Sequence, residues 1–159
     1  MIPKMSEEEF SKKYNLYSQL LFNISYGYTH NKEDAEDILQ EVFMKYLKLN
    51  HTFPNEQEEK YWLIRVTINA SISLTRKAYR RKVLLEDGKL YNISPSQKED
   101  NLIDLVITLP EKYKKVIILY YYDQFSVKEI AKILRITESA VMKRLERGRK
   151  ILRNLVEEN

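Results

Sequence analysis

The chain of 159 residues has no cysteine, only three glycines and two histidines, and no long apolar run. Without cysteine, a disulfide framework, a thiolate zinc site and a cysteine nucleophile are excluded. The glycines stand singly, so they form neither a dinucleotide-binding fingerprint nor a phosphate-cradling loop. Two histidines are too few for most metal sites. The sequence therefore predicts no metal site, no cofactor and no catalytic residue.

Membrane and export signals are also missing from the sequence. No stretch approaches the roughly 20 apolar residues that a membrane span needs. The first ten residues lack the apolar core of a signal peptide. We therefore expect a cytoplasmic protein without membrane insertion, of a length that suits one medium domain or two small ones.

The net charge of +4 is unevenly distributed along the chain. Residues 1–60 carry a net charge of −4, residues 61–90 of +5, residues 91–125 of −1 and residues 126–159 of +4. Two basic blocks separated by an acidic one indicate two contacts with a polyanion such as nucleic acid. The alternative is that the basic side chains form ordinary solvated helix faces.

Apolar residues recur at steps of three and four through most of the chain, and no strand pattern is convincing. The expected fold class is therefore all-α, with two small helical domains joined by a flexible linker. The predicted domains are residues 1–85 and 102–159. The intervening segment, residues 86–101, loses the helical periodicity and contains Gly88 and Pro95, which are typical of a linker.

Two predicted helices of the first domain carry unusual polar faces. The helix that follows a possible N-cap at Asn31 has an acidic face opposite an apolar one. The helix from about Lys60 to Arg80 has two apolar faces, with a polar seam between them made of Arg65, Asn69, Ser73 and Arg76. A helix that is apolar on two sides normally lies between neighbours. The seam therefore indicates a binding partner, unless its polar groups are buried and satisfied by backbone carbonyls.

The second domain has the pattern of a helix-turn-helix. Ser126 and Glu129 form a capping-box pattern, and Thr137 can cap a final helix with a basic outer face. Small residues at the start of a recognition helix allow close approach to base edges, and basic residues one turn later reach guanine or phosphate. The residues in these positions are Ser139, Ala140, Lys143, Arg144 and Arg147. An αα-hairpin would share the apolar pattern without needing this many basic residues.

Long segments of both predicted domains resemble the sigma-70 family of bacterial RNA polymerase. The segment LPEKYKKVIILYYYDQFSVKEIAKILRITESAVMKRLERGRKIL, residues 109–152, resembles region 4. The segments DAEDILQEVFMKYL, residues 34–47, and WLIRVTINASISLTRK, residues 62–77, resemble region 2. Two modules with a short linker and no other region are similar to the compact extracytoplasmic-function (ECF) group.

The resemblance implies a sigma subunit that binds bacterial core RNA polymerase and promoter DNA, with an anti-sigma factor as a further candidate partner. Region 2 would dock on the β′ clamp helices through Asp34, Asp37, Gln40, Glu41 and Phe43. It would engage and open the −10 element through Arg65, Asn69, Arg76 and Lys77. The loop around residues 50–57 would capture a flipped non-template base. Region 4 would rest on the β flap and bind the −35 duplex through Ser139, Ala140, Lys143, Arg144 and Arg147.

Some positions depart from the family pattern. The family commonly has Arg at the position of Ile68, Asp at Ser73, Gly-Thr at Ser139-Ala140 and Lys at Met142, so the promoter sequence is not carried over from relatives. An alternative function is a sigma-like regulator that acts through the helix-turn-helix without core polymerase. A nucleic-acid-processing enzyme is disfavoured, because no nucleophile and base accompany the carboxylates.

Overall fold

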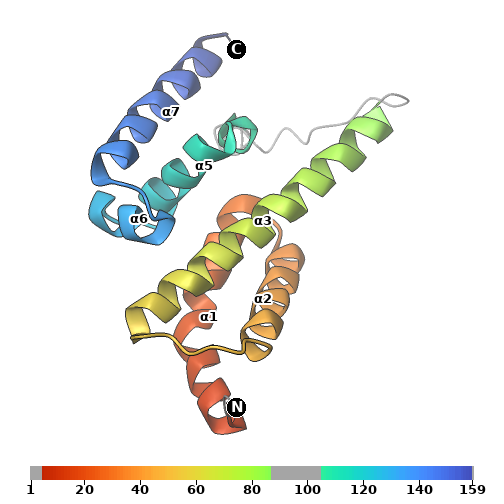
Figure 1. Cartoon of the computed structure of the whole chain (residues 1–159). Coiled ribbons are helices and arrows are strands. Elements are labelled where there is room, and N and C mark those ends of the chain that lie inside the picture. The colour runs from red at the N-terminus through yellow and green to blue at the C-terminus, as the bar shows by residue number, and fades with distance from the viewer. Residues whose placement is uncertain (1–4, 87–104, 159) are drawn as a thin grey trace. The chain divides into compact units, whose positions relative to one another are not determined.

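The computed structural model describes the backbone of residues 5–86 and 105–158, and their side chains except those of residues 78–86. Every regular element in these ranges is a helix, which confirms the all-α class (Figure 1). The chain divides into two compact units, residues 1–72 and 73–159. The predicted linker lies outside the described residues except for Glu86, which ends a helix.

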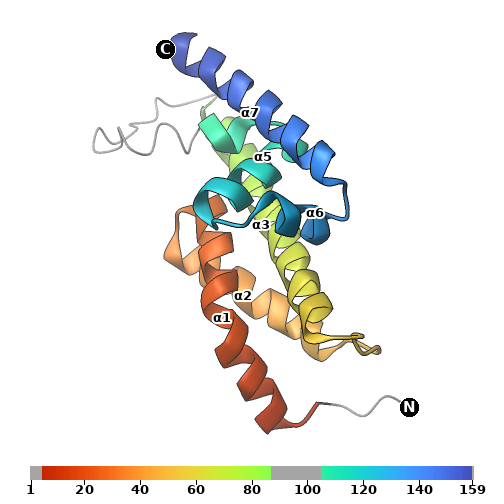
Figure 2. The ribbon, with the colours of Figure 1, turned by 90° about the vertical axis from the view of Figure 1, so that its left-hand side faces the viewer.

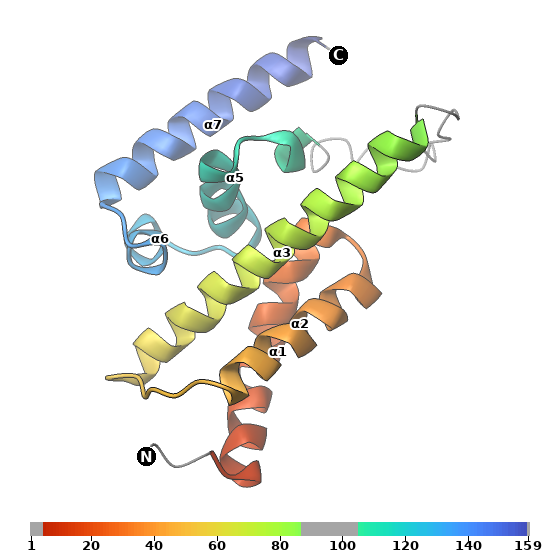
Figure 3. The same ribbon diagram turned by 45° about the vertical axis from the view of Figure 1, so that its right-hand side comes forward.

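The first unit is a bundle of three helices, α1 (Glu7–Thr29), α2 (Lys32–Leu47) and the first half of α3 (Glu56–Glu86). Helix α3 crosses α1 (Figure 3), and α1 packs against α2. Asn31 caps α2 as predicted, since its side chain accepts a hydrogen bond from the Asp34 N–H at 2.9 Å. Helix α3 begins at Glu56, earlier than the sequence pattern suggested, because Asn55 accepts a hydrogen bond from the Glu58 N–H at 2.9 Å.

The buried face of α3 differs from the two separate apolar faces that we expected. Thr67 and Ser71 are fully buried and join the isoleucines of this helix into one broad stripe. Their hydroxyls donate to the carbonyls of Leu63 and Thr67 respectively, each at 2.7 Å, so burial leaves no hydroxyl unsatisfied. Because successive residues of an α-helix are about 100° apart around its axis, the predicted polar seam faces away from this stripe. Asn69, which belongs to the seam, is exposed rather than buried.

The second unit contains a helical turn at residues 105–108, α5 (Glu111–Ile117), the π-helix η1 (Ile118–Tyr122), α6 (Val127–Leu134) and α7 (Glu138–Glu158). The capping box at α6 is present in both directions, as predicted. Thr137 accepts a hydrogen bond from the Ala140 N–H at 3.0 Å at the start of α7. The helices α6 and α7, joined by a tight turn, therefore form the predicted helix-turn-helix.

Close contact with α5 sets the position of α7, which lies alongside it (Figure 2). Gly148 is buried in this contact, and a Cβ atom there would lie 3.1 Å from Ile117 Cγ1. Glycine is less favourable in a helix than alanine by about 1 kcal/mol. The close approach of the two helices explains why it stands here.

The π-helical turn η1 was not expected from the sequence. It leaves Tyr120, Tyr121 and Tyr122 exposed at its surface and is followed by Asp123. In the part of the chain that the structure describes, Asp123 Oδ2 is buried without a hydrogen-bond partner. Burial raises the pKa of the Asp123 carboxyl to about 7.

We expect Asp123→Asn to remove a pH-dependent loss of stability. The folded chain retains the Asp123 proton up to about pH 7, whereas an ordinary aspartate has a pKa of 3.8. Because the folded state binds more protons between these values, the free energy of unfolding falls as the pH rises through this window. Urea unfolding at several pH values should show the variant gaining stability over the natural chain as the pH rises. The same pH dependence of the free energy of unfolding in the variant and the natural chain would contradict this. An equal effect from Glu146→Gln on the exposed face of α7 would contradict it as well.

Candidate functional site

Four of the residues predicted to bind polymerase lie together along α2. Asp37, Gln40 and Glu41 are exposed and Asp34 is half-buried, at helical spacings that place them on neighbouring turns. We call these four residues the acidic α2 surface. Glu41 forms an ion pair with Lys45 at 3.3 Å, and because both side chains are about half exposed, at 53% and 54%, this pair contributes little to stability. The carboxylates of this surface are therefore accessible to a basic partner.

The structure does not bring Phe43 to this surface. Its side chain is only 3% exposed and packs in the bundle. Its ring lies 4.8 Å from that of Tyr14 and 5.8 Å from that of Phe10, measured between centroids. Phe43 therefore fixes α2 against α1 and supports the acidic α2 surface from beneath.

The polar residues predicted on α3 for the −10 element have different environments. Asn69 and Lys77 are exposed, and Arg65 is half-buried. Arg76 is exposed but forms an ion pair with Glu111 within the second unit. Ile68, where the family commonly has arginine, is 1% exposed and belongs to the core. This position therefore offers no side chain to DNA.

The outer face of α7 presents the residues predicted for the −35 element. Ser139, Lys143 and Arg147 are exposed at steps of four, and Ala140 and Arg144 are half-buried beside them. Met142 lies among them and is 60% exposed. Opposite this face, Val141 and Leu145 are buried in the unit. Helix α7 therefore has the amphipathic form of a recognition helix.

A hydrogen bond that sequence reasoning missed links α7 to η1. Arg149 Nη1 donates to the Tyr121 hydroxyl at 2.8 Å. The two residues are far apart in the sequence, and no local pattern pairs them. This bond fixes one of the basic side chains of α7, whereas Lys143 and Arg147 carry no such restraint in the hydrogen bonds and ion pairs found within the described residues.

A pocket of about 940 Å³ opens in the first unit, next to the loop that was predicted to capture a base. Its walls come from the start of α1, the end of α2, the loop at residues 48–55 and the start of α3. Phe53 of the loop lies 5.7 Å from the ring of Trp62 and 5.3 Å from that of His51. The pocket therefore has an aromatic edge as well as polar residues in its lining, and this combination suits a planar polar ring.

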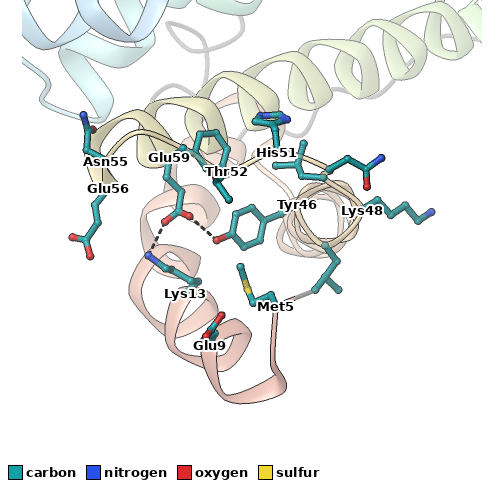
Figure 4. A pocket seen from close by; sticks show the side chains of 14 residues that line it. Met5, Glu9, Lys13, Tyr46, Lys48, His51, Thr52, Asn55, Glu56 and Glu59 are labelled. Atoms are coloured by element: carbon teal, nitrogen blue, oxygen red, sulfur yellow. Dashed lines mark hydrogen bonds and ion pairs between the residues drawn. The ribbon is translucent and has the colours of Figure 1, made fainter. Parts of the chain in front are cut away.

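Glu59 forms the floor of this pocket (Figure 4). Although only 9% of this residue is exposed, its carboxylate accepts hydrogen bonds from the Tyr46 hydroxyl at 2.7 Å and the Tyr17 hydroxyl at 3.4 Å. Lys13 Nζ lies 2.8 Å from Glu59 Oε1. Burial and the neighbouring Glu59 hold the pKa of Tyr46 well above its usual range. The hydrogen bond to Glu59 raises the pKa of Lys13. Both side chains therefore remain protonated donors at neutral pH.

Sequence reasoning missed this cluster. The predicted helix began at about Lys60, so Glu59 was not assigned to it and no role was predicted for its carboxylate. The available signal was the recurrence of Tyr17 and Tyr46 on faces that were otherwise apolar, since a buried tyrosine hydroxyl requires a polar partner.

The described ranges, 5–86 and 105–158, contain no group of three or more His, Asp or Glu side chains placed to hold a metal ion. None of their helices is both long enough and apolar enough to cross a membrane.

A helix-turn-helix with a basic outer face and a separate bundle with an acidic surface define a two-module protein of the DNA-binding class. Comparisons with known proteins specify it further. Residues 14–81 match the family model for sigma-70 region 2, and residues 99–152 match that for sigma-70 region 4. The ECF RNA polymerase sigma factor SigX of Bacillus subtilis is 30% identical over 165 residues, which cover 95% of this chain and 85% of SigX.

Two solved structures share the fold. CnrH, in complex with the cytosolic domain of CnrY, is 19% identical with a TM-score of 0.69, and the alignment covers 97% of this chain and 91% of CnrH. The sigma factor RpoE of Bartonella quintana, in complex with the anti-sigma factor NepR, is 20% identical with a TM-score of 0.59, over 94% and 98% of the two chains.

The chain belongs to the ECF group of the sigma-70 family. It is a promoter-specificity subunit of RNA polymerase, and the alternative of a regulator that acts without polymerase is not favoured. Sigma factors are in general initiation factors without catalysis of their own.

We expect Tyr46→Phe to destabilise the first unit more than Tyr61→Phe. Both tyrosines are 4% exposed, but Tyr46 donates to a buried carboxylate while the Tyr61 hydroxyl accepts from the Gln57 amide at 2.8 Å. Loss of a hydrogen bond to a charged group costs about 1.5–3 kcal/mol, against about 1 kcal/mol for a neutral one. Urea unfolding of the full chain measures both, and equal losses would contradict the central position of Glu59.

Proposed function

We propose that the chain directs polymerase to promoters through separate surfaces on two domains, residues 1–85 and 102–159, joined by the linker at residues 86–101. The observation that carries this assignment is the segregation of charge. The acidic α2 surface belongs to the first unit, and the basic outer face of α7 belongs to the second. An acidic surface repels DNA phosphates and attracts a basic protein, whereas a basic helix attracts DNA.

The acidic α2 surface is the proposed docking site for core RNA polymerase, at its β′ clamp helices. Exposed carboxylates and the Gln40 amide are available there, and charge complementarity accelerates association and fixes its register. Phe43 contributes by holding α2 in place. Since the polymerase supplies the chemistry of RNA synthesis, we assign no catalytic step to this chain and place it in the cytoplasm with the polymerase.

Promoter DNA is proposed to bind through its −10 element and its −35 element. On α3, Arg65, Asn69, Arg76 and Lys77 would contact the −10 element. The pocket above Glu59 would hold a base unstacked from the non-template strand, and unstacking costs a few kcal/mol that favourable contacts in a pocket offset. On α7, Ser139, Ala140, Lys143, Arg144 and Arg147 would read the −35 duplex in the major groove while the unit rests on the β flap.

An anti-sigma protein is the further partner that we propose. Two proteins of the same fold, CnrH and RpoE, were solved in complexes with CnrY and the anti-sigma factor NepR respectively. A protein that covered the acidic α2 surface or the outer face of α7 would block polymerase or promoter binding by competition.

Charge reversal on α2 tests polymerase docking. We expect Asp37→Lys combined with Glu41→Lys to abolish association with core polymerase, because like charges would then face the basic partner. Association is measured by native gel shift or light scattering with purified core enzyme and no DNA. The matched control is Glu7→Lys with Glu8→Lys, which makes the same charge change at exposed positions of α1. Unchanged association of the α2 variant would support the alternative that the chain acts without core polymerase.

A second test concerns the −35 duplex. We expect Arg147→Ala to weaken duplex binding and to flatten its dependence on salt, because each phosphate contact contributes about 0.9 to the slope of log K against log salt. Fluorescence anisotropy with holoenzyme and duplex DNA at several salt concentrations measures both. Lys12→Ala, which removes the same charge from the exposed face of α1, should leave the slope unchanged. If Arg147→Ala alters neither affinity nor slope, Arg147 lies outside the interface.

A further inference from the structure

Part of the proposed base pocket comes from residues that precede the matched sigma-70 region. The region 2 match begins at residue 14, whereas Met5, Glu9 and Lys13 also line the pocket. Met5 precedes α1, whereas Glu9 and Lys13 lie in its first turns, and Figure 4 shows the three side chains on the side of the pocket opposite His51. The pocket therefore has a wall from the start of α1, contributed by residues that the region 2 match does not include.

Lys13 is the side chain of this wall that is best placed to contact a ligand. Its side chain is 25% exposed, and its ammonium is held 2.8 Å from Glu59 Oε1. An ammonium has three N–H donors, and in the described residues its hydrogen-bond partner is the Glu59 carboxylate. Two donors consequently remain available at a fixed point on the pocket surface.

Glu59 fixes this ammonium because its own position is fixed. Its two carboxylate oxygens accept from Tyr46, Tyr17 and Lys13, which come from α2 and α1. A long lysine side chain in water samples many rotamers, and ordering it costs up to about 2 kcal/mol. Here the folded bundle has already ordered the side chain before a ligand arrives, so a ligand that meets it does not bear this cost.

The charge balance of the pocket favours a neutral ring over a phosphate. Glu9, Glu56 and Glu59 outnumber the two ammonium groups of the lining, those of Lys13 and Lys48. A phosphate would therefore meet excess negative charge, whereas a nucleobase brings carbonyl oxygens and ring nitrogens that accept hydrogen bonds. The aromatic side chain of Phe53 adds a surface on which such a ring packs.

We propose that Lys13 is a specificity-determining contact of the captured base, donating from its Glu59-anchored ammonium to an acceptor on the base edge. This rests on the proposed function of the pocket as a site for an unstacked non-template base. The role of Glu59 is positional, since it holds the ammonium that makes the contact.

The experiment measures how much the base itself contributes to binding. Wild-type holoenzyme first selects single-stranded non-template oligonucleotides from a randomised pool. Each position of the selected strand is then replaced in turn by an abasic nucleotide. The position at which this replacement weakens wild-type binding most identifies the captured base. The same intact and abasic strands are then bound to holoenzyme carrying Lys13→Met, with Lys12→Met as the matched control on the adjacent exposed lysine.

We call the factor by which an abasic replacement at the captured position weakens binding the abasic penalty. The expected result is that Lys13→Met reduces the abasic penalty by roughly 10-fold, the size of one charge-assisted hydrogen bond. Lys12→Met should leave the penalty unchanged. If Lys13→Met weakens intact and abasic strands equally, Lys13 contacts the backbone or acts on folding alone, and this proposal is wrong while base capture stands. If no abasic replacement weakens wild-type binding, base capture itself fails, and the Lys13 contact with it.

A second variant covers the case in which Lys13→Met does not fold. Lys13→Arg keeps the ion pair with Glu59 but presents a planar fork of donors in place of the compact ammonium. We expect it to alter the order of preference among the four bases at the captured position. An unchanged order and an unchanged abasic penalty in this variant would overturn the proposal.

Discussion

The first unit depends on one buried carboxylate. Glu59 sits where α1, α2 and α3 meet, and its oxygens receive hydrogen bonds from Tyr17 and Tyr46 and the ammonium of Lys13. A buried charge without partners is costly, and breaking a buried pair by removing one member commonly costs about 3–5 kcal/mol. With its donors in place, the same charge specifies how the three helices meet. The α2 helix that carries the acidic surface and the wall of the pocket are therefore positioned by one group.

Separation of charge is the second organising constraint. A protein that binds both a basic protein surface and DNA must keep its acidic and basic groups apart, because mixed charges would neutralise each other. Here α2 carries an acidic surface and α7 a basic outer face, on different compact units. On the opposite face of each helix, apolar residues such as Val42 of α2 and Val141 of α7 are buried. Each charged surface is thus the solvent side of a helix whose other side forms a core.

Local signals in the sequence were sufficient for most of the fold. The caps at Asn31, Ser126 and Thr137 are short-range hydrogen bonds between residues three apart, and the sequence shows them directly. The helix-turn-helix follows from these caps and from apolar spacing. The family resemblance then supplied a function that composition and spacing alone left open between several nucleic-acid binders.

Features that depend on distant partners were not predictable in the same way. Tyr17 and Glu59 are 42 residues apart, so the cluster at the pocket floor exists only in the folded bundle. Phe43 was placed on a binding surface because its sequence context matches one, yet its aromatic neighbours on α1 bury it. Thr67 and Ser71 looked polar, but hydrogen bonds to their own helix make them suitable for the core.

Gly148 has a consequence for substitutions on the opposite side of α7. The close approach that it permits fixes α7 through residues on the inner face, whereas Ser139 and Met142 on the outer face are exposed. Substitutions at Ser139 or Met142 would therefore alter the surface that α7 presents while the position of the helix stays the same. The chemistry of the exposed face can in this way change while the unit that holds the helix stays intact.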